Sequence, residues 1–93
     1  MNKHYQVYVI RCTAKSGRET IHVGVAHDAL SRMQDHQKGW VKATRGRDIA
    51  MVGFSRAMPQ GDALRMEMKL KSMPPAEKVK WALSGGSDVK GLE

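Results

Sequence analysis

Two short runs of aromatic and β-branched residues near the N-terminus constrain the fold most, because together they predict a β-hairpin. The first run, YQVYVIRC at 5–12, ends at the turn-forming sequence TAKSGR. The second run covers 19–25 and is expected to pair back onto the first. The connection contains Ser16 and Gly17 and is long enough for a loose loop rather than a two-residue turn. An antiparallel sheet is therefore expected at the start of the chain.

The rest of the chain predicts helices around one further strand. Asp28 can cap a helix that runs to about Lys38 and stops at Gly39. A third strand is expected at 49–55, and two helices are expected at 61–73 and 75–83. The order ββαβαα predicts a small mixed α+β fold, in which a mainly antiparallel sheet is flanked by helices.

The segment 61–73 carries the clearest helical periodicity. Proline ends it at Pro74, and Pro75 can begin the last helix because proline is tolerated in a first turn. On a helical wheel, the apolar residues of this segment share one broad arc. They are Ala63, Leu64, Met66, Met68, Leu70 and Met73.

Glu67 lies near the middle of this apolar arc. Leaving a lone carboxylate without water costs several kcal/mol, which is close to the whole stability of a small domain. Glu67 therefore needs a partner, and two interpretations are open. It could form an ion pair with Lys71, or it could line a cleft and hold a divalent cation, since hard cations bind carboxylates together with substrate phosphates.

On the helix that begins after Asp28, Arg32 and His36 are four residues apart and lie on one side. Arginine can pair with a phosphate through two hydrogen bonds, and histidine can donate a hydrogen bond to the same group. The alternative interpretation is a solvated edge on which Arg32 pairs with Asp28 or Asp35.

Tyr8 and His22 fall on the two neighbouring strands and could face a common cleft. Histidine has an ordinary pKa of about 6.5, which suits a general base at neutral pH, whereas tyrosine at about 10 needs cationic neighbours. The alternatives are a half-buried core tyrosine with a hydrogen-bonded hydroxyl and a structural histidine.

Sixteen Lys and Arg against nine Asp and Glu give the 93 residues a formal net charge of +7. Such an excess attracts polyanions, and nucleic acid is the commonest of them. A membrane surface is disfavoured, because the basic residues form no single amphipathic helix and no apolar stretch approaches the length of a span. Four basic residues in one stretch are expected to contact backbone phosphates. They are Lys38, Lys42, Arg45 and Arg47.

A single domain is expected at 1–83, with a flexible tail at 84–93 whose final Leu92 and Glu93 look like the residues left by a cloning site. The lone Cys12 excludes an intramolecular disulfide, and a reducing, cytoplasmic location is expected. The oligomeric state is left open.

Read in chain order, these positions resemble the GIY-YIG nuclease domain, and most closely its small stand-alone members of the UPF0213 type. The match covers about residues 5–80. Its pieces are Gln6-Val7-Tyr8 for the first motif, His22-Val23-Gly24 for the second, DALSRMQDHQKG with Arg32 and His36, KATRGR at 42–47, and ALRMEMKLK with Glu67 and Lys71.

The resemblance implies a small three-stranded antiparallel sheet flanked by helices, and cleavage of a nucleic-acid phosphodiester, chiefly in DNA, in repair or recombination. It implies one divalent metal ion, Mg²⁺ or Mn²⁺, with Glu67 as the matching metal ligand. Arg32 matches the arginine that stabilises the transition state, and Tyr8 matches the tyrosine of the first motif. His36 falls where some members place a phosphate-contacting or proton-relaying histidine. Lys71 is expected to contact nucleic acid.

Two positions depart from the family pattern. Gln6 stands in place of a glycine of the first motif, and His22 stands in place of the second tyrosine. A histidine can accept a proton at pH 7, so cleavage with changed roles is one expectation. A degenerate module that binds nucleic acid without cutting is the other. Substrate targeting is expected to come from the basic surface, from an oligomer or from a protein partner.

Overall fold

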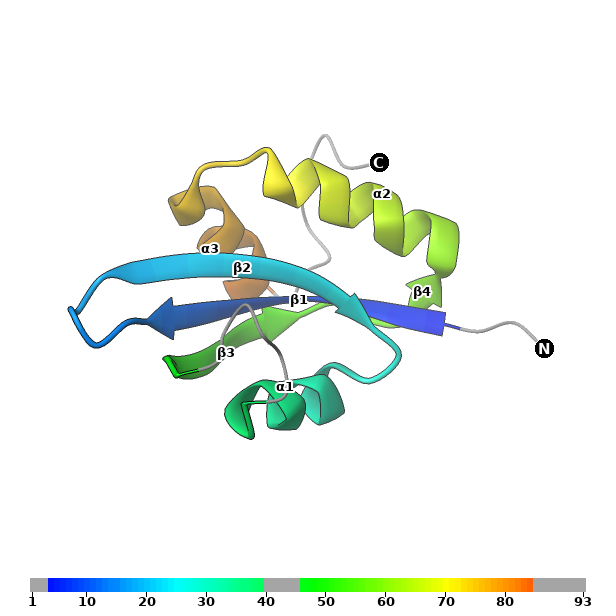
Figure 1. Cartoon of the computed structure of the whole chain (residues 1–93). Helices are drawn as coiled ribbons and strands as arrows, with labels where there is room; N and C mark the ends of the chain where they lie inside the picture. The colour runs from blue at the N-terminus through cyan, green and yellow to red at the C-terminus, as the bar shows by residue number, and fades with distance from the viewer. Residues whose placement is uncertain (1–3, 40–45, 85–93) are drawn as a thin grey trace.

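The structure, a computed structural model, describes residues 4–39 and 46–84. The strands are β1 (His4–Thr13), β2 (Glu19–Ala26), β3 (Asp48–Phe54) and β4 (Met58–Pro59), and the helices are α1 (Ala29–Gln37), α2 (Gln60–Lys71) and α3 (Pro75–Leu83). The predicted mixed α+β fold with an antiparallel sheet is confirmed, as is the predicted order of its main elements (Figure 1).

Strand β1 is the centre of the sheet. It pairs antiparallel with β2 on one side and with β3 on the other, and its first residues also pair with the two-residue β4. Strand β4 was not predicted from the sequence, because two residues show no periodicity and one of them is Pro59. The predicted hairpin is confirmed, and its loop closes where Gly17 takes a φ of 88°, a conformation that favours glycine.

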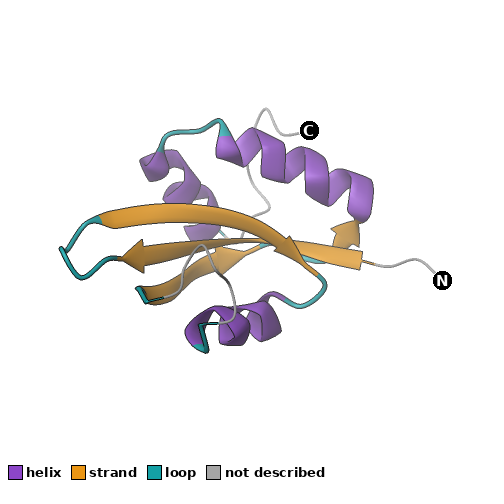
Figure 2. Cartoon of the chain, in the orientation of Figure 1, coloured by secondary structure: helices purple, strands orange, loops and turns teal. Residues whose placement is uncertain are grey.

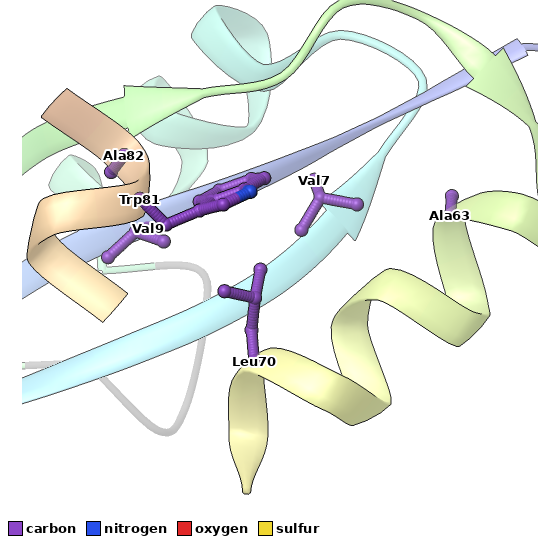
Figure 3. Packing of buried hydrophobic residues seen from close by; sticks show 6 residues of the cluster. All are labelled: Val7, Val9, Ala63, Leu70, Trp81 and Ala82. Atoms are coloured by element: carbon purple, nitrogen blue, oxygen red, sulfur yellow. The ribbon is translucent and has the colours of Figure 1, made fainter. Parts of the chain in front are cut away.

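The helices cover the sheet unequally, with α1 on one face and α2 and α3 on the other (Figures 1 and 2). Alternate residues of β1 divide between these faces. Val7 and Val9 pack under α2 and α3, with Leu70 and Trp81 as the large apolar partners (Figure 3). This packing forms the main core.

A second, smaller core lies under α1, where Ile10 and Cys12 of β1 contact Met33. Tyr8 belongs to the same set of alternate residues, so its side chain also lies on the α1 face. Cys12 is a free and buried cysteine. The helix itself begins as predicted, since Asp28 Oδ1 accepts hydrogen bonds from the N–H groups of Leu30 and Ser31.

Helix α2 buries a narrower arc than the sequence predicted. Ala63 and Leu70 are buried, but Leu64 is 44% exposed and Met68 is 72% exposed. Only the part of the arc that faces β1 and β2 loses its contact with water, so the wheel overestimated the buried side. Along the described parts of the chain, no helix has the length and apolar character required to cross a membrane.

Candidate active site

The α1 face of the sheet brings together Tyr8 of the first motif and His22 of the second. Ile10 of β1 lies opposite His22 of β2, and Tyr8 lies opposite Gly24. Residues directly opposite in an antiparallel pair point to the same face, so Tyr8 and His22 share the face that α1 covers. The hairpin register therefore brings these two predicted site residues together.

The central contact of this site joins Tyr8 to His36. The Tyr8 hydroxyl and His36 Nε2 share a hydrogen bond with an O···N distance of 3.1 Å. Their rings meet edge to face, with centroids 5.8 Å apart and planes at 83°. Both residues are buried, so the pair is shielded from solvent and its geometry is fixed by packing.

Gly24 makes room for this pair. A Cβ at Gly24 would lie 2.6 Å from Tyr8 Cε1 and closer still to Cζ and the hydroxyl oxygen. The glycine of the second motif is therefore required by the close approach of the tyrosine ring to the backbone of β2. The sequence offered a signal for this role, because the predicted hairpin places the two residues near each other.

Burial raises the pKa of Tyr8 above its ordinary value, and the negative charge of Glu67 adds to that rise. The Arg32 guanidinium acts in the opposite direction, through hydrogen bonding and charge, without cancelling the effect of burial. The hydroxyl therefore keeps its proton at neutral pH and can donate it.

The pKa values of the two histidines of the site are lowered, whereas that of Tyr8 is raised. Burial lowers the pKa of His22, and the charges of Arg47 and Lys78 lower it further. Burial also lowers the pKa of His36, and the charges of Arg32 and His22 lower it further. Both imidazoles are consequently neutral at pH 7, and a neutral imidazole has a ring nitrogen that can accept a proton.

Arg32 is accessible to a ligand from solvent. Its side chain is 43% exposed and forms an ion pair with Asp35 at 3.7 Å, which is one of the two partners expected for a solvated edge. The same guanidinium acts to lower the pKa of Tyr8, and it also lines an open hollow of about 210 Å³. Asp28 and Ser31 are among the other lining residues of this hollow. An anionic ligand could therefore reach Arg32 from solvent.

Glu67 has the ion-pair partner that the sequence suggested. Its Oε2 lies 3.5 Å from Lys71 Nζ, and only 20% of the Glu67 side chain is exposed. Helix α2 covers the opposite face of the sheet from α1, yet the carboxylate is near enough to influence the pKa of Tyr8. The structure therefore supports the ion-pair interpretation of Glu67, with a weak electrostatic effect on Tyr8 from the other face of the sheet.

A metal ion would find few protein ligands here. Across residues 4–39 and 46–84, no group of three or more His, Cys, Asp and Glu side chains gathers. A hard cation can be held by one or two carboxylates when substrate phosphate and water supply the remaining oxygens. Glu67 fits that mode of binding, provided that Lys71 releases it when substrate arrives.

The predicted basic stretch is only partly described. Lys38 and Arg47 are exposed, whereas Lys42 and Arg45 lie outside the described residues. Sequence analysis did not single out Lys78 of α3, whose charge reaches His22. No sequence signal marks it, because its proximity to His22 depends on how α3 packs against the sheet.

Comparison with known proteins gives one similarity. The chain is 29% identical over 90 residues to a UPF0213 protein of Yersinia enterocolitica, and the match covers 95% of this chain and 89% of that protein. This similarity supports the UPF0213 part of the resemblance. No protein-family model matches the chain, and no solved structure does. The name UPF0213 states no activity, so the roles of the site residues depend on their geometry.

Proposed function

We propose that this protein is a metal-dependent endonuclease that hydrolyses nucleic-acid phosphodiester bonds, chiefly in DNA, in repair or recombination. The observation that carries the proposal is the buried hydrogen bond between Tyr8 and His36, formed on the same face of the sheet as His22 and beside the accessible Arg32. The order of the motifs along the chain, which resembles that of the GIY-YIG nucleases, supports it.

The transition state of phosphodiester hydrolysis collects negative charge on the non-bridging oxygens. A guanidinium held at that point stabilises the transition state more than the ground state. Arg32 can serve in this way by exchanging Asp35, a half-buried partner 3.7 Å away, for a phosphate. A divalent ion held by Glu67 and the substrate would supply further charge neutralisation at the phosphate and the leaving oxygen.

The attacking water must lose a proton, and the site offers two acceptors. In the first route, the Tyr8 oxygen takes the proton of the water while the hydroxyl passes its own proton to His36 Nε2, so Tyr8 stays neutral and His36 becomes charged. In the second route, neutral His22 accepts the proton directly. Either route uses an imidazole that is uncharged before the reaction.

The test is an activity screen with branched, nicked, single-stranded and duplex DNA, and with the corresponding RNAs, in Mg²⁺, Mn²⁺ or EDTA. Arg32→Ala and Glu67→Ala should each lose about 100-fold or more of the cleavage rate. Their matched controls are Arg65→Ala and Glu77→Ala, which remove exposed residues of the same types. Cleavage that persists in Arg32→Ala or Glu67→Ala would mean that a contaminating nuclease is responsible.

Substitutions of histidine can show which of the two proposed proton acceptors operates, the Tyr8–His36 pair or His22. His22→Ala should lose more activity than His4→Ala or His27→Ala, because both control residues are exposed and His27 is engaged elsewhere, bonded to the carbonyl of His4 and stacked on Tyr5. If His22→Ala cuts at the parental rate, the Tyr8–His36 pair is the proton acceptor on its own.

A nucleic-acid-binding module without catalysis is the second candidate. The ion pair between Glu67 and Lys71 favours it, because that pair engages the carboxylate that a metal ion would need. Such a module would bind DNA or RNA in a salt-dependent manner and would cut neither in any metal condition. The same activity screen therefore distinguishes the two candidates.

A further inference from the structure

We propose that Gln6 is a positioning residue, which fixes α1 against the sheet and thereby sets the places of Arg32 and His36. The catalytic consequence of this role rests on the proposed nuclease function, whereas its structural consequence can be measured without any cleavage.

The side-chain amide of Gln6 joins two distant parts of the chain. Its Oε1 accepts a hydrogen bond from the N–H of Ala29, the first residue of α1, with an O···N distance of 2.9 Å. Its Nε2 donates to the carbonyl oxygen of Ser55, just beyond β3, at 3.1 Å. One side chain of β1 therefore connects the start of α1 to the end of β3.

The chemistry of these two partners explains why this position holds a glutamine. The backbone N–H of Ala29 can only donate, and the carbonyl of Ser55 can only accept. An amide presents an acceptor and a donor on neighbouring atoms, whereas a carboxylate only accepts and an ammonium only donates. A glycine, which the first motif of the resembling nucleases carries here, could make neither bond.

Ser55 offers a rigid point of attachment. Its side chain is buried, with Oγ accepting from the N–H of Val7 at 2.9 Å and donating to the carbonyl of Arg56 at 2.8 Å. Its own N–H donates to the carbonyl of Val7 at 2.8 Å. The residue that Gln6 holds is therefore fixed to β1 by the backbone as well as by its side chain.

Gln6 and Tyr8 are two residues apart on β1 and lie on the same face. Gln6 holds the start of α1 at Ala29, and Tyr8 holds it near its end at His36. These two points are about 10 Å apart along the helix axis, and Arg32 lies between them. Met33 packs on Ile10 and Cys12 between these points, and the two polar contacts at the ends of the helix set its direction across the sheet.

The test compares Gln6→Met and Gln6→Glu with a matched control, Gln34→Met, which changes an exposed glutamine of α1. Methionine keeps the length of the side chain and loses both hydrogen bonds. Glutamate keeps the acceptor for Ala29 and loses the donor to Ser55. The readouts are the pKa of the His36 imidazole by NMR titration, and kcat and KM for cleavage.

Gln6→Met should move the pKa of His36 up towards its ordinary value, because a displaced α1 lets water reach the imidazole. The kcat should fall about 10- to 100-fold with a smaller change in KM, since misplaced catalytic groups affect chemistry more than binding. Gln6→Glu should lower kcat by less than Gln6→Met, because it keeps the hydrogen bond to Ala29, and Gln34→Met should match the parent in both readouts.

An unchanged His36 pKa in folded Gln6→Met would overturn the positioning role, even if the parent protein cuts DNA. A changed His36 pKa in a protein that cuts no substrate would support the positioning role while the nuclease function fails. If Gln6→Met does not fold, Gln6→Glu decides, because an unchanged pKa and kcat in that variant would show that the link to Ser55 has no effect on the site.

Discussion

At the scale of single residues, the pair formed by Tyr8 and His36 shows how one physical effect sets two protonation states. Burial disfavours charge, so it raises the pKa of the tyrosine and lowers the pKa of the histidine. The gap between the two values widens, and the shared proton stays on the tyrosine in the resting protein. The positive charge of Arg32 lowers the pKa of both residues, so it offsets part of the rise for Tyr8 and adds to the fall for His36.

Tyr8→Phe should remove the hydroxyl and leave the ring that packs against Gly24. Cleavage should fall about 100-fold or more, because a positioned proton-transfer group contributes on that scale. The free energy of unfolding should fall by only about 1 kcal/mol, the net value of one hydrogen bond. Tyr5→Phe is the control, since its ring stacks on His27 and needs no hydroxyl for that contact. Parental cleavage by Tyr8→Phe, measured as kcat, would contradict the proposed route through Tyr8.

The two site histidines predict that acid destabilises the fold. Their pKa values are lower in the folded protein than in the unfolded chain, so the unfolded chain binds more protons in mild acid. Their contribution is fully present above about pH 6.5 and is lost as the pH falls through the folded pKa values. Denaturant unfolding from pH 8 to pH 5 should show this decline, and a double variant, His22→Gln with His36→Gln, should flatten it. An equal decline in the double variant would refute the assignment.

At the scale of elements, the sequence predicted most boundaries within one or two residues. Periodicity marked β1 and β2, and the capping residue Asp28 marked the start of α1, because these signals are local. The exposure of Met68 was not predicted, since a helical wheel shows which residues share a side and not how far that side is covered. The same limit applies to the site, where the ion pairs within one helix, Glu67 with Lys71 and Arg32 with Asp35, were foreseen while the contact of Tyr8 with His36 was not.

Two glycines of the sheet lie where an added side chain would collide with a neighbour, one with the Tyr8 ring and the other with α3. A Cβ at Gly24 would overlap the Tyr8 ring, and a Cβ at Gly53 would lie 2.8 Å from the carbonyl carbon of Ala82, and nearer to its oxygen. Alanine at either position should lower the free energy of unfolding by about 1 to 3 kcal/mol.

Only Gly24→Ala should also displace Tyr8 from His36 and reduce kcat when the rates are compared at equal concentrations of folded protein. Gly53→Ala pushes against α3 on the other face of the sheet and should leave the pKa of His36 unchanged in an NMR titration. Equal losses of kcat in the two variants would mean that general loosening of the fold, and not the place of Tyr8, limits activity.

At the scale of the whole molecule, the net charge of +7 predicts an attraction for polyanions, and the structure shows where part of that charge lies. Arg47 precedes β3 and Lys78 lies on α3, and the charges of both lower the pKa of His22. Cations gathered near a site can draw a phosphate backbone towards it without reading its sequence.

Binding to duplex DNA should weaken linearly on a plot of log affinity against log salt concentration, since bound phosphates release counterions. Arg47→Gln and Lys78→Gln should each reduce the slope by about 1, the contribution of one phosphate contact. Arg65→Gln is the control, because it removes the same charge from an exposed residue of α2 that pairs with Asp62. Fluorescence anisotropy over a salt series measures the slope, and an equal reduction in all three variants would point to net charge alone.

The sequence by itself determined the helices, the three longer strands, their order and the residue types that resemble a nuclease, because the periodicity and capping signals of these elements act between near neighbours. Only the tertiary structure decided the hydrogen bond of Tyr8 to His36 and the two bonds of the Gln6 amide. The partners in those bonds are 23 to 49 residues apart along the chain. Local periodicity carries no information on such pairs, because they form only when α1 and the end of β3 are packed against β1.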